Sequence, residues 1–202
     1  MRTATFLAKR CTTVRSLLPL IGLVCTPMDV SGQVLLTQEE ALQLAFPEPA
    51  GVERRTAFLA EDELAEVKRL AEPAESNGRS VVTYYIGRNG DQPLGVAYFD
   101  AHRVRTLQEV LMIVVDRRGR VARIEVLGFA EPPEYMAPDG WLDLFSGRGL
   151  DHGTSTRGDI PIITGATLTA RAATGAVRRS LALHQVIGPF DGFASADSER
   201  GQ

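Results

Sequence analysis

The chain has 202 residues, of which 44% are hydrophobic and 23% are charged, and its formal net charge is −3 at pH 7. This length fits one domain behind a leader segment, or two small domains at most. The composition is that of an ordinary globular protein, and a slightly acidic chain gives no sign of the basic surface that nucleic acid requires, so we expect no nucleic-acid partner.

The first 32 residues have the pattern of an export signal. Basic residues such as Arg2 and Lys9 precede a short apolar run at residues 17–25, and small residues follow at 30–32. This order is typical of a signal peptide. The apolar run has only about half of the ~20 residues that a membrane-spanning helix needs. We therefore predict a signal peptide over residues 1–32, and a location in the periplasm or on the outer face of the cytoplasmic membrane.

Both cysteines, Cys11 and Cys25, fall inside the predicted leader. A mature chain without the leader has no thiol, which excludes a cysteine nucleophile and a cysteine-bound metal cluster. The histidines, His102, His152 and His184, are far apart and have no carboxylates at metal-ligand spacing. We therefore predict no metal site and assign each histidine to the surface or the core.

Residues 33–79 are predicted to be a helical segment. Thr37 and Glu40 have the spacing of a capping box, and apolar residues follow as far as Phe46. Prolines end this helix. A second helix is predicted over residues 61–70, because apolar residues recur there on one helical face.

From residue 80 the apolar pattern becomes that of β-strands. The predicted strands are residues 81–86, 94–100, 110–115 and 121–127. They form two hairpins, the first with Asn89-Gly90 in its turn. The continuous apolar run at 111–115 predicts a central strand covered on both faces. Antiparallel hairpins flanked by helices indicate an α+β fold, and we predict a single domain over residues 80–190.

The remaining segments connect this sheet to a last helix. Pro132 and Pro133 predict that residues 131–135 are extended. The other predicted segments are a short helix at 139–145, a loop at 147–158, a strand-like run at 160–163, a helix at 170–184 and a disordered polar tail at 191–202.

The most informative sequence of the chain lies where the strand-like run meets the last helix. It reads Thr-Gly-Ala-Thr-Leu-Thr over residues 164–169, and we call it the motif. The first N–H groups of a helix lack intrahelical partners and carry partial positive charge, so a phosphate binds there readily. Gly165 and Ala166 leave the backbone open to a bulky ligand. A threonine held there can hydrogen-bond a phosphate or be esterified to one, but on spacing alone the threonines can also simply cap the helix.

The motif resembles the Ser/Thr-Gly-Ala-Thr flavinylation motif of the FMN-binding domain family. That family includes the flavin-carrying subunits of the sodium-pumping NADH:quinone reductase and of Rnf-type electron transport complexes. In it, FMN is joined through its phosphate to the threonine after the alanine, which is Thr167 here. The resemblance covers roughly residues 80–184 and includes the Glu131-Pro132 pair and Trp141.

The resemblance implies a set of FMN-binding residues. They are Thr164, Gly165, Ala166, Thr167, Leu168, Thr169, Glu131 and Trp141. Thr167 Oγ1 would be the ester oxygen, and the other motif threonines and nearby N–H groups would hold the phosphate oxygens. Trp141 would form a wall for the isoalloxazine ring, and Glu131 would orient polar atoms of the backbone or the flavin.

One position departs from the family pattern. The family's flavin transferase usually meets an aspartate three residues before the motif, where this chain has Pro161. Three functions stay open: an exported electron carrier with FMN on Thr167, a non-covalent FMN-binding or sensing module, and an exported structural domain without flavin. The first implies electron-transfer partner proteins, including a membrane redox complex, and a flavin transferase for maturation. No acid–base pair is visible, which favours a carrier over a stand-alone enzyme.

Overall fold

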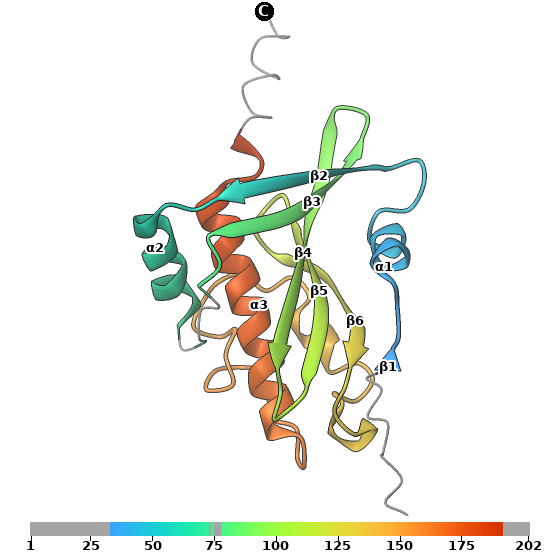
Figure 1. Ribbon diagram of the computed structural model, residues 1–202, viewed down its shortest axis with the longest axis vertical. Helices are drawn as coiled ribbons and strands as arrows, with labels where there is room; N and C mark the ends of the chain where they lie inside the picture. Colours follow the sequence, from blue (N-terminus) through green and yellow to red (C-terminus); the bar gives the residue numbers. More distant parts are fainter. Residues whose placement is uncertain (1–32, 73, 75–77, 192–202) are drawn as a thin grey trace, which may run out of the picture.

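The computed structural model describes residues 33–72, 74 and 78–191. The predicted signal peptide over residues 1–32, with both cysteines, and nearly all of the predicted tail lie outside these residues. Within them, six antiparallel strands form one sheet in the order β1-β6-β5-β4-β3-β2, and helices pack on both of its faces (Figure 1). The predicted α+β class is confirmed.

The elements follow the predicted order. The strands are β1 (Gln33–Val34), β2 (Gly51–Phe58), β3 (Val81–Asn89), β4 (Gln92–Arg103), β5 (Gln108–Asp116) and β6 (Val121–Phe129). The helices are α1 (Gln38–Ala45), α2 (Glu61–Ala71) and α3 (Thr167–Ile187), with short 3-10 helices η1 (Pro133–Tyr135) and η2 (Leu142–Phe145). The four predicted strands, their two hairpins and both N-terminal helices are therefore confirmed.

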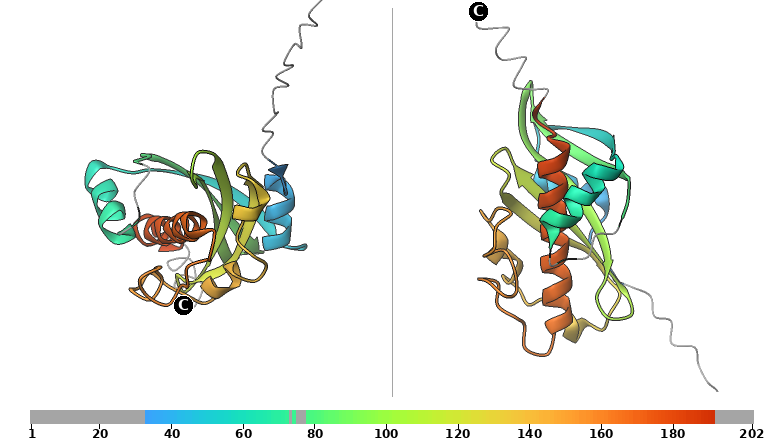
Figure 2. Two further views of the ribbon diagram at one scale, coloured as in Figure 1. Left: turned by 90° about the horizontal axis from the view of Figure 1, so that it is seen from below. Right: turned by 90° about the vertical axis from the view of Figure 1, so that its left-hand side faces the viewer.

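The sheet separates two apolar layers, because side chains along a strand alternate between its faces. On β5, Leu111, Ile113 and Val115 share a core with α3, whereas Met112 and Val114 share a core with α1. Figure 2 shows α3 and α1 on opposite sides of the sheet. The continuous apolar run of β5 thus belongs to a central strand that is covered on both faces, as predicted.

α1 is fixed to its face of the sheet by the residue that follows it. At the start of α1 the predicted capping box is present: Thr37 N–H donates to Glu40 Oε2 at 2.8 Å, and Glu40 N–H donates to Thr37 Oγ1 at 3.2 Å.

At the end of α1, Phe46 is 4% exposed and lies against Gly87 of β3. A Cβ at Gly87 would overlap the Phe46 ring, so the glycine creates the space into which the ring packs.

α2 is held against α3 by a buried arginine. The Arg178 guanidinium donates from Nε to Ala71 O at 3.0 Å and from Nη2 to Leu70 O at 3.1 Å. Its Nη1 donates to Asp151 O at 2.7 Å and to Thr154 O at 3.1 Å. The carbonyls at the end of α2 lack intrahelical partners, so Arg178 caps that helix while it also fixes the following loop to α3.

The sequence analysis missed two strands within residues 33–79. β2 pairs along its full length with β3, and β1 pairs with β6, so the segment predicted to be helical supplies both edges of the sheet. β2 reads Gly-Val-Glu-Arg-Arg-Thr-Ala-Phe and alternates between exposed and half-buried residues. Charged side chains are common on edge strands because they block further pairing, and here they conceal the apolar alternation by which a strand is predicted.

Three local predictions near the motif were also wrong. Residues 133–135 form the 3-10 helix η1 instead of an extended segment, since a proline is tolerated in the first turn, where its missing N–H has no partner to lose. Residues 160–163 are not a strand; Ile160, 1% exposed, instead packs into the core between the sheet and α3. α3 begins at Thr167, three residues earlier than predicted.

Candidate functional site

The motif lies at the end of the molecule where the chain enters α3, the lower end of that helix in Figure 1. Thr164 and Gly165 form a turn, and Ala166 N–H donates to Ile163 O at 3.1 Å. Gly165 has a φ of +84°, which glycine adopts without steric cost. A Cβ at this position would meet nothing within 4 Å, so there is open space above the backbone of the motif.

α3 begins without a side-chain cap. Ala166 is the N-cap residue, and no side chain accepts a cap hydrogen bond there. Among the residues that the structure describes, no partner is found for the N–H groups of Thr167, Leu168 and Thr169; the next N–H, of Ala170, donates to Ala166 O at 3.1 Å. The explanation of the threonines as simple caps is therefore wrong. Open N–H groups at the positive end of a helix are the features that bind a phosphate.

The three threonines of the motif differ in what their hydroxyls contact. Thr169 is 1% exposed, and its Oγ1 donates to Tyr135 O at 2.5 Å. Thr164 is exposed and Thr167 is half-buried, and within the described part of the chain neither hydroxyl has a hydrogen-bond partner. Thr169 therefore offers a ligand its N–H, whereas Thr164 and Thr167 offer their hydroxyls as well.

Trp141 supports the segment that leads into the motif. Its Nε1–H donates to Pro161 O at 3.0 Å, and its ring packs edge-on against Phe145 with centroids 5.4 Å apart. Trp141 is 7% exposed and Phe145 is fully buried. The structure thus gives Trp141 a packing role beneath residue 161. Its contact with the flavin ring stays a prediction.

Glu131 holds the loop between β4 and β5 at the same end of the molecule. Its Oε1 accepts the N–H groups of Leu107 at 2.8 Å, Thr106 at 2.6 Å and Arg105 at 3.1 Å. These bonds, led by those from Leu107 and Thr106, lower the pKa of the Glu131 carboxyl. The Arg105 guanidinium in turn lies 4.5 Å from the Tyr135 ring centroid.

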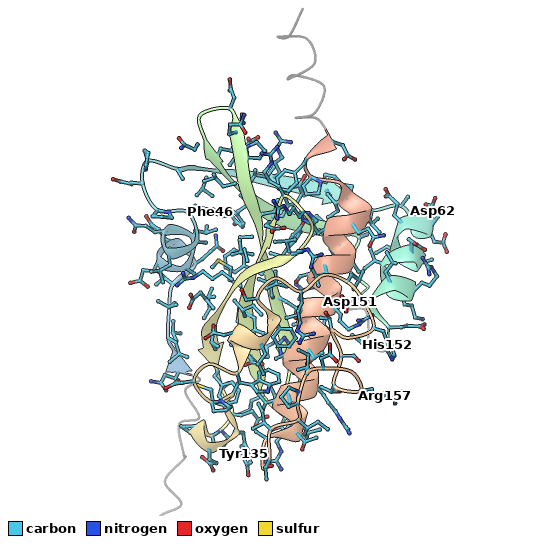
Figure 3. All side chains as sticks on the ribbon, turned by 180° about the vertical axis from the view of Figure 1, so that it is seen from behind. Phe46, Asp62, Tyr135, Asp151, His152 and Arg157 are labelled. Carbon is cyan, nitrogen blue, oxygen red and sulfur yellow. The ribbon has the colours of Figure 1, made fainter. Side chains whose placement is uncertain are left out.

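Tyr135 connects this loop to the motif. Figure 3 labels Tyr135 at the end of the molecule where α3 begins, and its carbonyl accepts the Thr169 hydroxyl. Its ring meets the Arg105 guanidinium on the loop that Glu131 holds. Glu131 therefore shapes the surroundings of the motif through the loop and Tyr135. A direct contact between Glu131 and the flavin stays a prediction.

A buried cluster of charged residues that was not predicted lies beside the middle of α3, where it includes Arg179. His102 Nδ1 lies 2.9 Å from Asp100 Oδ1, and His102 Nε2 lies 2.9 Å from Glu109 Oε2. Arg179 of α3 forms a two-pronged ion pair with Asp100 at 2.9 and 2.8 Å. The side chains of these four residues are 1–10% exposed. We call them the β4 cluster.

Mutual hydrogen bonds keep the β4 cluster ionised. Burial opposes the charge on Asp100, but hydrogen bonds from His102 and Arg179 outweigh it and hold the pKa of Asp100 well below its usual range. Burial likewise opposes the charge on His102, but hydrogen bonds to Asp100 and Glu109 outweigh it and raise the pKa of His102. The signal that could have revealed this cluster is Asp100 and His102 two residues apart on one strand face, with Glu109 directly opposite His102.

Two cavities flank α3 just after the motif. The first, which we call the β4 groove, has a volume of about 430 Å³. Its walls come from α3 and from the end of β4, with Ala74 beside them: Leu168, Arg171, Ala172, Gly175, Arg179, His102, Arg103 and Val104. The second, the loop groove, has a volume of about 310 Å³ and lies between α3 and the loop that carries Arg157, which is labelled in Figure 3. Arg171 and Gly175 line both.

Two kinds of feature were not found in the described part of the chain. No group of three or more His, Cys, Asp or Glu residues there has the arrangement to hold a metal ion. No helix there is both long and apolar enough to cross a membrane.

The residues of the motif fit a phosphate-bearing cofactor. The open N–H groups of the first turn suit an anion, the space above Gly165 admits a bulky group, and the hydroxyl of Thr167 lies at the helix start without a partner among the described residues. The nearby cavities fall within the roughly 300–1,000 Å³ of typical ligand pockets.

Comparison with known proteins agrees with this chemistry. Residues 108–182 match the model of the FMN-binding domain. No curated protein and no solved structure matches the chain. The matched region runs from the first residue of β5 into α3 and contains Glu131, Trp141 and the whole motif. Residues 108–182 therefore correspond to an FMN-binding domain, and this match indicates FMN as the cofactor.

Proposed function

We propose that this protein is an extracytoplasmic electron carrier whose FMN is joined by a phosphoester bond to Thr167 Oγ1. The observation that carries the proposal is the start of α3: Thr167 is its first residue, the helix has no side-chain cap, and the Thr167 hydroxyl has no partner in the described part of the chain. When bound, FMN accepts and releases electrons at its isoalloxazine ring, while the protein supplies attachment, orientation and electrostatics.

The charges around the motif suit a phosphodiester. Esterification removes the hydroxyl hydrogen of Thr167 and one hydroxyl of the FMN phosphate as water, and leaves one negative charge on the phosphate. The N–H groups of Leu168 and Thr169 and the positive end of the helix dipole stabilise that charge. Arg171 lies one turn after Thr167 and is exposed, so it can add a charge-assisted contact.

The surroundings of the motif favour a carrier over a stand-alone enzyme. The groups that they offer are backbone N–H groups, threonine hydroxyls and guanidinium groups, which hold anions. Glu131 is the acidic residue that the sequence analysis placed among the FMN-binding residues. Its carboxylate accepts N–H groups of the loop between β4 and β5. A carrier exchanges electrons with partner proteins, and we propose a membrane redox complex among them. The export signal predicted over residues 1–32 supports the proposal that this exchange takes place outside the cytoplasm.

The test is the intact mass of the denatured protein after export from a host that contains a flavin transferase. We expect a gain equal to FMN less one water in the wild type, and no gain in Thr167→Ala. Thr56→Ala is the matched control, because it removes an exposed threonine hydroxyl on β2, outside the motif. We expect Thr56→Ala to keep the added mass. An unmodified wild type, or an added mass that persists in Thr167→Ala, contradicts attachment at Thr167.

A second function, non-covalent FMN binding, is favoured by one observation. Position 161, where the family's flavin transferase usually meets an aspartate, holds a proline, and its carbonyl is engaged by Trp141 Nε1–H. On this alternative the denatured protein has its unmodified mass and FMN appears in the released small-molecule fraction. Absence of flavin from both fractions would instead favour a structural domain.

A further inference from the structure

We propose that the β4 groove binds the isoalloxazine ring of the FMN whose phosphate lies at Thr167. This inference rests on the proposed position of the phosphate. It assigns the ring to one of the two cavities beside α3 and gives the residues of the β4 cluster a role in the cofactor site.

The position of the β4 groove links it directly to the motif. Leu168, the residue after Thr167, lines the groove and is 45% exposed. Ala172 and Gly175 follow at helical spacings of four and three residues, so they lie in the same stripe along α3. The groove therefore begins at the proposed attachment residue and continues along the helix.

The groove has the volume and some of the apolar contacts that a flat ring requires. Its volume of about 430 Å³ lies within the roughly 300–1,000 Å³ of ligand pockets. Leu168 and Val104 provide apolar contacts. At Gly175, a Cβ would come 3.2 Å from Arg179 and 3.3 Å from Ala74, so a larger residue would crowd the groove.

Among the described residues, the polar side chains that line the groove are three arginines and one histidine: Arg103, Arg171, Arg179 and His102. None of the described lining residues is acidic. The carboxylates of Asp100 and Glu109 lie behind this surface, where they hold His102 on both sides and Arg179 on one. Arg103 and Arg171 line the groove as well, so guanidinium groups face it from both β4 and α3. Guanidinium N–H groups donate to carbonyl oxygens such as those at the polar edge of the ring.

The loop groove suits the ring less well. It is lined by no residue of the motif, and much of its wall is polar, with Ser155, Thr156 and Arg157 from the loop. Its volume is smaller, about 310 Å³. Arg171 lies between the two grooves, so it can contact either the phosphate or the ring.

The experiment uses riboflavin as the probe, because it has the ring but no phosphate and cannot form the ester. Protein produced without a flavin transferase is titrated with riboflavin by equilibrium dialysis. Ala172→Leu fills the β4 groove from a half-buried position, and Thr156→Leu fills the loop groove as the matched control. We expect riboflavin binding in the wild type, no more than a twofold change in Thr156→Leu, and at least a tenfold weaker affinity in Ala172→Leu.

Other outcomes overturn the assignment of the ring. Absence of riboflavin binding in the wild type, unchanged affinity in Ala172→Leu, or a larger loss in Thr156→Leu would each do so. Far-UV circular dichroism of each variant confirms folding. Leu168→Ser provides a second test, since it removes an exposed apolar wall without adding volume; we expect at least a threefold weaker affinity, and an unchanged affinity contradicts the proposal.

The intact mass keeps this test separate from the proposed function. In a host with a flavin transferase, Ala172→Leu should keep the mass gain of one FMN less one water while the induced circular dichroism of its flavin bands falls severalfold. Loss of the mass gain in the wild type contradicts attachment at Thr167. An unchanged dichroism in Ala172→Leu with the mass gain present contradicts the ring position alone.

Discussion

The two ends of α3 are built in opposite ways. At the C-terminal end, Gly188 adopts the left-handed conformation with a φ of +55°, and its N–H donates to His184 O at 3.2 Å. Asp191 N–H then donates to Gly188 O at 3.0 Å. At the N-terminal end, by contrast, Ala166 supplies no cap. The chain itself satisfies the C-terminal end, whereas the N-terminal end leaves its N–H groups open to water or to an anionic ligand.

Cavity size does not distinguish the two ends. A cavity of about 450 Å³ lies at the C-terminal end of α3, between that end and the arginine-rich turn that joins β5 to β6. It is lined by no residue of the motif, and His184 in its wall is paired with Tyr98. The chemistry of the first helical turn therefore identifies the cofactor site better than volume does.

The largest expected effect concerns the buried middle of α3. Arg178→Ala removes a guanidinium that donates to four carbonyls and leaves them without that partner, so we expect the free energy of unfolding to fall by about 3 kcal/mol or more. Urea denaturation measures this. Arg171→Ala, at an exposed position on the same helix, should change stability by less than about 0.5 kcal/mol. Equal effects of the two substitutions would contradict the contrast between the buried Arg178 and the exposed Arg171.

The next effect concerns pH at the C-terminal end. Burial lowers the pKa of His184 from 6.5 to about 4. As the pH falls from 6.5 to 4, His184 of the unfolded chain therefore binds a proton that His184 of the folded protein binds only near pH 4. The free energy of unfolding should decrease by about 3 kcal/mol between neutral pH and pH 4. Denaturation of His184→Gln across this range should show that this loss has disappeared.

Gln185 provides the control for the pH experiment. It is exposed on α3 next to His184 and has no titratable group, so Gln185→Ala should leave the pH profile of stability as it is in the wild type. A profile of His184→Gln that still falls as steeply as the wild type between pH 6.5 and 4 would assign the loss to another group.

The smallest effect concerns the open end. Thr169→Val keeps the shape of the side chain but removes the hydroxyl that donates to Tyr135 O, so we expect a cost of about 1 kcal/mol in thermal or urea denaturation. Because this hydroxyl is already used, FMN attachment should persist in the variant. Thr164→Val, at an exposed site, should be nearly neutral for stability. Loss of FMN in Thr169→Val without loss of stability would instead make Thr169 a direct ligand.

The elements that were predicted well are those whose signals are local. The capping box of Thr37 and Glu40 predicts where α1 begins, and the Asn89-Gly90 turn predicts the first hairpin, because the interacting groups are a few residues apart. β2 was missed because it depends on its partner: its charged sequence becomes a strand by pairing with β3, more than twenty positions along the chain.

The sequence by itself determined the FMN-binding domain over residues 108–182, its cofactor and the motif at the start of α3, since these follow from the order of residue types along the chain. Only the tertiary structure decided that Thr169 is engaged by Tyr135, and that the Thr164 and Thr167 hydroxyls have no partner among the described residues. It also decided that His102 lies in a charged cluster beside the motif, because Arg179 and Asp100 meet across 79 positions of the chain. Contacts over such distances depend on how the sheet and α3 pack, which no local pattern contains.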